Sequence, residues 1–263
     1  MSINAALFNG LAGMNSFSTA LSVVSDNVAN ANTTGFKANT PLFSDLVSGF
    51  FTGMLGDTEM AGAGSRATSV LSNLNQGSIG DGTRWSDLAI QGDGFFAVQD
   101  SAGETFYTRD GSFKLDNQGY LATNSGNRVL DTGGNPIQVM QNLPTIDISN
   151  LSVSNDGTIS YTDATGQPQT MASQIGITTF RDPNALLRRG NNMFSPLDPA
   201  DAQVGTANDG IRGAIMGSSL ESSNVDLAKE MVNMIIYQAS YNANSKSIST
   251  SKDMIDTTIG MVR

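Results

Sequence analysis

The chain has 263 residues and carries 24 acidic against 14 basic side chains, a formal net charge of −10. An acidic chain is repelled by a phosphate backbone, so no nucleic-acid partner is expected. The chain contains neither cysteine nor histidine, which excludes disulfides and thiolate metal sites, removes the commonest general base, and weighs against an enzyme.

The N-terminal residues carry an apolar side chain at nearly every third or fourth position. This spacing predicts a helix of about four heptads, roughly 40 Å long. Residues 1–36 contain one charge, Asp26, and the opposite face is Ser, Asn, Thr and Ala, which is unusual for a solvated helix. The apolar positions are Ile3, Leu7, Met14, Phe17, Leu21, Val24 and Val28.

The C-terminal residues 223–263 repeat this pattern. Ser223 and Asp226 resemble a capping box at the start of a second helix. Both helices could pack on one central core, but the long separation between them favours packing on each other and on copies from other chains. The seam contains Leu227, Met231, Met234, Tyr241, Ile248, Ile255, Ile259 and Val262, with the polar residues Gln238, Ser245 and Lys252 in its middle.

Between the helices, from about residue 86 to 195, the hydrophobic period changes to two. Short β-prone runs such as LAIQ, GFFAVQD and TFYT alternate with glycine-containing turns. The run LSVSNDGTISYT predicts a hairpin with Asp156 and Gly157 at its turn. IGITTF, residues 175–180, predicts a further strand. We therefore predict a compact all-β domain over residues 86–195.

Two connections complete the chain. Residues 45–85 contain too many glycines for a stable helix and are too apolar for a free linker, so we predict that they become ordered only against a partner. Residues 196–222 form a return connection rich in Gly, Ala and Asp. Residues 1–44 hold the first helix and an Asn-rich terminator, and 223–263 hold the second helix, which makes the fold class α+β.

No catalytic, cofactor or metal site is predicted. Asp100, Glu104, Asp110 and Asp116 lie close in sequence, but they sit in turns, where Asp is favoured because it bonds its own backbone. No calcium-loop pattern occurs. The alternative from another class is a secreted carbohydrate-binding β protein that uses Trp85, Tyr107 and these carboxylates, but it leaves the terminal heptads unexplained.

The stretch DNVANANTTGFKA that closes the first helix resembles the N-terminal signature of bacterial flagellar axial proteins, the rod and hook family. LAIQGDGFFAVQD with YTRDGSFKLDNQGYL resembles the family's β-domain motif. ESSNVDLAKEMVNMIIYQASYNANSKSIST resembles its C-terminal motif. The matching residues of the first signature are Asn27, Ala29, Asn30, Thr34, Gly35, Phe36 and Lys37.

This resemblance implies a structural subunit whose paired terminal helices form a coiled-coil-like inner domain, with one all-β outer domain. Such subunits polymerise helically into a hollow tube that transmits torque and conducts exported subunits. The implied partners are copies of this chain, adjoining rod, hook or hook-junction proteins and the flagellar type III export apparatus. No small-molecule substrate is implied. No basic residue precedes Lys37, so no cleaved signal peptide is expected.

The choice between rod and hook stays open in the sequence. Hook proteins of this family generally carry extra β domains, and this chain has room for one, which favours the distal rod of the basal body. The ending TTIGMVR and the opening helix look more hook-like, so an extracellular hook subunit is the alternative.

The residues predicted to form the subunit interface are the two helix seams and the terminator. Gly35 is predicted to allow the turn that ends the first helix, and Phe36 to anchor in a groove of a neighbouring subunit. The full set is Ile3, Leu7, Met14, Phe17, Leu21, Val24, Val28, Asn30, Gly35, Phe36, Leu227, Met231, Met234, Tyr241, Ile248, Ile255 and Ile259.

Overall fold

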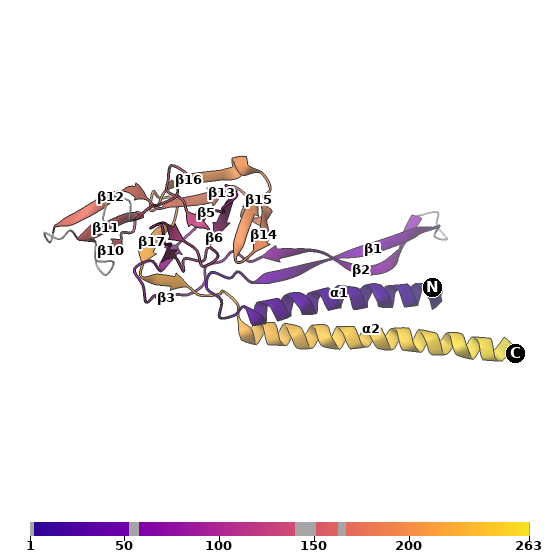
Figure 1. Ribbon diagram of the computed structural model, residues 1–263. Coiled ribbons are helices and arrows are strands. Elements are labelled where there is room, and N and C mark those ends of the chain that lie inside the picture. The colour runs from indigo at the N-terminus through magenta and orange to yellow at the C-terminus, as the bar shows by residue number, and fades with distance from the viewer. Residues whose placement is uncertain (1–2, 53–57, 140–150, 163–166, 263) are drawn as a thin grey trace. The chain divides into compact units, whose positions relative to one another are not determined.

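A computed structural model describes residues 3–52, 58–139, 151–162 and 167–262. The chain divides into two compact units. Unit 1 consists of Met1–Ala31, Ala38–Asn73 and Val225–Arg263, and unit 2 of Asn32–Lys37 and Leu74–Asn224. The predicted α+β class is confirmed: one helix stands near each end of the chain, and unit 2 is rich in strands (Figure 1).

The two helices of unit 1, α1 (Ile3–Ala29) and α2 (Leu227–Val262), run antiparallel along one another (Figure 1). Their backbones approach closely because glycines stand at the contact. A β-carbon on Gly10 would lie 2.8 Å from Cγ1 of Ile248, and one on Gly13 would lie 2.7 Å from Oδ1 of Asn244. Neither described helix is both long and apolar enough to cross a membrane.

The buried row of α1 consists mostly of small residues and shares only Val24 with the predicted apolar seam. This row is Gly10, Gly13, Ser16, Ala20, Val24 and Asn27. Of the predicted seam, Val24 is buried in unit 1, while Leu7, Met14, Phe17, Leu21 and Val28 are half-buried. The reason is that α1 packs on two sides, against α2 and against a β-hairpin, and small side chains let all three backbones come together.

The predicted seam of α2 is half-buried at every seventh residue from Met234 to Ile255, whereas Leu227 and the seam residues between are exposed. Met234, Tyr241, Ile248 and Ile255 are half-buried as expected. Between them, the face toward α1 contains Tyr237, Asn244 and Ser251, whereas the predicted Gln238, Ser245 and Lys252 are exposed. The ring centroids of Phe17 and Tyr237 lie 6.1 Å apart, which places the aromatic residue, not its polar neighbour, at the contact.

Residues 45–85, predicted to become ordered only against a partner, mostly form structure within the chain. The strands β1 (Asn39–Thr52) and β2 (Thr58–Ser72) pair antiparallel. Their partner is α1 itself: the Ser16 hydroxyl donates a hydrogen bond of 2.8 Å to the Ser65 carbonyl. The amide of Asn27 bonds both the carbonyl and the N–H of Asn39, each at 2.8 Å, and so fixes where β1 begins.

The described residues of unit 2 contain the remaining strands and the short 3-10 turns Pro183–Ala185 and Pro199–Asp201. The strands are β3 (Ile79–Asp81), β4 (Leu88–Gln91), β5 (Phe95–Gln99), β6 (Thr105–Thr108), β7 (Lys114–Leu115), β8 (Leu121–Ala122), β9 (Arg128–Val129), β10 (Leu151–Val153), β11 (Thr158–Thr162), β12 (Pro168–Gln174), β13 (Gly176–Phe180), β14 (Leu186–Gly190), β15 (Met193–Pro196), β16 (Ala202–Thr206), β17 (Ala214–Gly217) and β18 (Ser219–Glu221).

The largest sheet of unit 2 has the order β14-β15-β6-β5-β9-β8-β7, with β13 joining β5 to β16. The strands β10, β11 and β12 form a separate three-stranded sheet, and β17 pairs with β4 and β18 with β3. The core is built from buried aliphatic side chains around Phe96 and Phe113, whose ring centroids are 5.1 Å apart. Trp85, the single tryptophan of the chain, packs against this core.

The turn predicted at Asp156 and Gly157 is confirmed, because it joins β10 and β11 and Gly157 has a φ of 85°. The strand predicted over residues 175–180 is confirmed as β13. Residues 196–222 differ from the expected connection, because they contribute β16, β17 and β18. These strands are too short, and too often interrupted by turn residues, for an alternation of apolar and polar residues to be recognised in the sequence. They can be identified only from the strands with which they pair.

Candidate functional site: an apolar helix face and a buried junction of motifs

Two features of the structure are candidates for function, and the first is an exposed apolar face on α2. We define the apolar face of α2 as Leu227, Met231, Val232, Ile235 and Ile236, which are between 43% and 66% exposed. Their spacing of one, three and four residues places them on one half of the helix. This half is turned away from the row that faces α1. Large exposed apolar patches of this kind mark surfaces for other proteins.

The apolar face of α2 includes part of the predicted interface and adds to it. Leu227 and Met231 were predicted, and Ile259 is a further predicted residue exposed near the end of α2. Val232, Ile235 and Ile236 were missed because the strict heptad template selects a narrow seam. Two exposed residues of α1, Phe8 and Leu11, were missed for the same reason. The side chain of Ile3 lies outside the described residues.

The terminator residues face their own chain. The side-chain amide of Asn30 donates to the backbone carbonyl and the carboxylate of Asp26, each at 2.9 Å, and so holds the end of α1. The ring of Phe36 is 1% exposed and lies beneath the Arg188 guanidinium, whose carbon is 5.0 Å from the ring centroid. The predicted anchoring of Phe36 in another subunit is therefore wrong, because its ring has no free surface.

Gly35 also has a different role from the one predicted. The helix α1 ends at Ala29, so Gly35 lies beyond the residue that terminates it. Its φ of 65° belongs to the left-handed region, and a β-carbon there would lie 2.5 Å from the backbone nitrogen of Asp110. Glycine is needed because the chain both turns and touches another backbone at this point.

The second candidate feature is a buried ionic cluster in unit 2, which we call the junction: Lys37, Arg109 and Glu221. The Lys37 ammonium donates to one carboxylate oxygen of Glu221 at 2.6 Å, and the Arg109 guanidinium to the other at 3.3 Å. All three side chains are at most 4% exposed. Each comes from a different one of the three sequence motifs, which the fold brings to one point.

Burial and ion pairing act in opposite directions at the junction. Desolvation lowers the pKa of Lys37 below its ordinary value, while the hydrogen bond and charge of Glu221 act to raise it. Desolvation likewise lowers the pKa of Arg109, opposed by the charges of Glu221 and Asp93. Glu221 thus favours the charged forms of both cations against the effect of burial.

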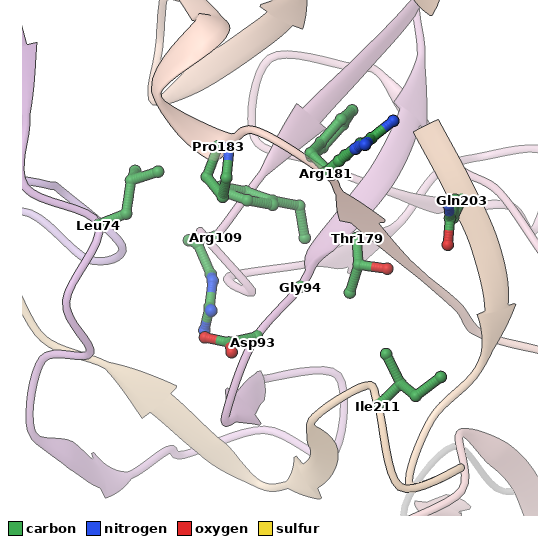
Figure 2. A pocket seen from close by; sticks show the side chains of 11 residues that line it. Leu74, Asp93, Gly94, Arg109, Thr179, Arg181, Pro183, Gln203 and Ile211 are labelled. Atoms are coloured by element: carbon green, nitrogen blue, oxygen red, sulfur yellow. The ribbon is translucent and has the colours of Figure 1, made fainter. Parts of the chain in front are cut away.

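Arg109 also forms part of the wall of a hollow of about 380 Å³ in unit 2, with Asp93 pointing toward its guanidinium (Figure 2). Its Nη2 also donates to the backbone carbonyl of Gly92 at 2.7 Å, and its Nη1 to that of Ile90 at 3.3 Å. The guanidinium lies 5.4 Å from the centroid of the Phe95 ring. Arg109 is therefore held from several sides and is a fixed part of the fold.

The turn carboxylates bond their own backbone, as predicted. Asp100 accepts from the N–H of Ser101, Asp110 from that of Ser112 and Asp116 from that of Asn117. Among the described residues, no three acidic side chains come together as a metal site. Tyr107, a residue of the carbohydrate-binding alternative, is only 7% exposed and cannot serve as a platform for a sugar.

Comparison with known proteins assigns the class. Residues 7–37 match the family described as "Flagella basal body rod protein". Residues 89–161 match "Flagellar hook protein FlgE/F/G D1 domain", and residues 216–261 match "Flagellar basal body rod FlgEFG protein C-terminal". These ranges contain the junction residues Lys37, Arg109 and Glu221 and the apolar face of α2. The class is that of the bacterial flagellar hook and rod proteins.

Individual relatives narrow this class. The flagellar basal-body rod protein FlgG of Bacillus subtilis is 37% identical over 98% of this chain and 99% of its own length. FlgG of Borreliella burgdorferi is 31% identical over 95% of this chain and 96% of its own. The flagellar basal-body rod protein FlgF of Mesorhizobium japonicum is 31% identical over 97% of this chain and 98% of its own length. The chain belongs to the flagellar basal-body rod protein family and is a structural rod subunit of the flagellum.

Proposed function

We propose that this chain polymerises helically into the hollow distal rod of the flagellum, with the apolar face of α2 as its principal contact between subunits. The observation that carries the proposal is that this face, five large apolar side chains on one half of a helix, is uncovered in the single chain. At about 25 cal/mol per Å² of apolar area, covering it supplies a favourable term for assembly.

The contact must be heterologous, because a self-complementary one would close into a dimer rather than grow. The partners are then further copies and the adjoining rod, hook or hook-junction proteins at each end. The subunit has no enzymatic activity in this proposal, and it reaches the rod through the flagellar type III export apparatus. Its location is the periplasmic part of the basal body.

A matched pair of variants tests the contact. Ile235→Ser removes an apolar side chain that is 66% exposed on the face, and Ile211→Ser removes one that is 76% exposed in unit 2. We expect Ile235→Ser to raise the protein concentration at which filaments form by about tenfold, the equivalent of roughly 1.4 kcal/mol. Ile211→Ser should leave it unchanged. Filament mass in sedimentation and electron microscopy measure both, and equal effects would reject the face.

Deletion of the gene tests the place in the flagellum. In electron micrographs of isolated basal bodies we expect rods that stop short below the outer rings. Complete rods that lack only the curved hook would instead make the chain a hook subunit, and intact flagella would reject both positions. The names of the relatives give the hook no advantage over the rod.

A further inference from the structure

The junction joins segments that lie far apart in the sequence. Lys37 and Glu221 are separated by 184 positions, and Arg109 lies between them. Lys37 ends the short stretch Asn32–Lys37, by which the N-terminal part of the chain enters unit 2. Glu221 ends β18, the last strand of unit 2. The junction therefore contains both the first and the last part of this unit.

Glu221 is the residue on which the others converge. Its carboxylate accepts from Lys37, from Arg109 and, at 2.8 Å, from the backbone N–H of Gly77. Its backbone carbonyl accepts from the N–H of Gly35 at 2.8 Å. One residue thus bonds to the N-terminal stretch, to the segment before β3 and to the guanidinium that follows β6.

The charges of the junction are unequal, because two cations share one carboxylate. Without Lys37, Arg109 and Glu221 would remain as a neutral pair. Without the Glu221 carboxylate, Lys37 and Arg109 would face one another as like charges in a buried site, with Asp93 acting only on Arg109. Stranding a buried charge costs far more than removing a whole pair.

We propose that Glu221 is the closing residue of unit 2: its single carboxylate neutralises two cations set in place by earlier parts of the chain, so that the unit is stable only once β18 has docked. Because residues 219–221 are synthesised after every other described strand of unit 2, a chain that ends before them lacks the carboxylate that neutralises both cations. This device is independent of polymerisation and concerns the fold of the single subunit.

Three variants of the full-length chain test the inequality of charges. Glu221→Gln keeps the shape of the side chain and removes its negative charge, and Lys37→Met removes one cation. The double variant combines these two substitutions and leaves Arg109 in place. Unfolding in urea is followed by the fluorescence of Trp85, which is the single tryptophan and belongs to unit 2. Glu104→Gln, at an exposed turn, is the matched control for loss of a carboxylate.

We expect Glu221→Gln to raise the equilibrium constant for unfolding by about a hundredfold or more, and Lys37→Met by less than about tenfold. The double variant should be more stable than Glu221→Gln alone, because one stranded cation is gone. If Glu221→Gln does not fold, recovery of the Trp85 transition in the double variant gives the same support. Equal costs for the two single variants, or a double variant no better than Glu221→Gln, would overturn the proposal.

Discussion

At the scale of single residues, some positions require glycine because two backbones come close together, and others hold buried charges. Gly35 is the clearest position of the first kind, since its φ is positive and a β-carbon would meet the backbone of Asp110. Gly126 also has a positive φ, 91°, but no heavy atom lies within 4 Å of where its β-carbon would stand. A side chain at Gly126 would therefore meet only the strain of a positive φ, whereas one at Gly35 would meet both that strain and a steric clash.

We expect Gly126→Ala to lower the free energy of unfolding by about 1 kcal/mol, the strain alone, and Gly35→Ala to lower it by more than about 3 kcal/mol. Urea unfolding followed by Trp85 fluorescence measures both. Equal losses would mean that the backbone around Asp110 moves away without cost, and that Gly35 is required only for its turn.

Tyr107 gives unit 2 a dependence on alkaline pH. Burial raises the pKa of its phenol above the ordinary 10.0. Above about pH 10 the unfolded chain therefore loses this proton while the folded chain retains it, so the unfolding free energy falls as the pH rises. We expect Tyr107→Phe to show a shallower fall in urea titrations between about pH 9 and 11. An identical slope in both proteins would contradict a buried neutral phenol.

At the scale of elements, the pairing of α1 with α2 depends on which residues of α2 face inward. Tyr237 contacts the rings of Phe17 and Phe43, with centroid separations of 6.1 and 6.4 Å. Gln238, the next residue, is exposed. The heptad pattern of the sequence assigns the opposite roles to these two neighbours.

We expect Tyr237→Ala to lower the free energy of unfolding of unit 1 by about 1–2 kcal/mol, because a half-buried ring is lost from an aromatic cluster. Gln238→Ala should stay within about 0.5 kcal/mol of the parent. Circular dichroism at the helix band during urea unfolding is the measurement. A larger effect at Gln238 would restore the register expected from the heptads.

At the scale of the whole molecule, the net charge of −10 opposes assembly of identical copies. Salt shortens the Debye length from about 10 Å at 0.1 M to about 3 Å at 1 M and so screens this repulsion. We expect filaments to form at a lower protein concentration in about 0.5 M NaCl than in about 0.05 M. Sedimentation at a series of protein concentrations measures the threshold, and filaments that dissolve on adding salt would show that ion pairs hold the subunits together.

Much of the fold could be predicted because it follows from local patterns. The heptad spacings of apolar residues predict α1 and α2, and the turn at Asp156 and Gly157 predicts its hairpin, since each depends on neighbouring residues alone. The strands β16, β17 and β18 were missed because short strands become recognisable only through the strands they pair with.

Of the candidate sites, Leu227 and Met231 could be predicted from helical spacing, but the width of the apolar face could not. The sequence shows which residues share a side of a helix, and only the packing of α1 shows which side is already covered. The three motifs likewise predict the family but not the junction, because nothing local links Lys37 to a carboxylate 184 positions away.

The sequence by itself therefore determined the class of the fold, the two terminal helices and the membership of the flagellar rod and hook family, all of which rest on short-range periodicity and motif order. Only the tertiary structure decided which side of α2 faces α1, the pairing of β1 and β2 along α1, and the contact of Lys37 and Arg109 with Glu221. These depend on long-range contacts, whose free energy is set by which surfaces meet and by which charges lose water together.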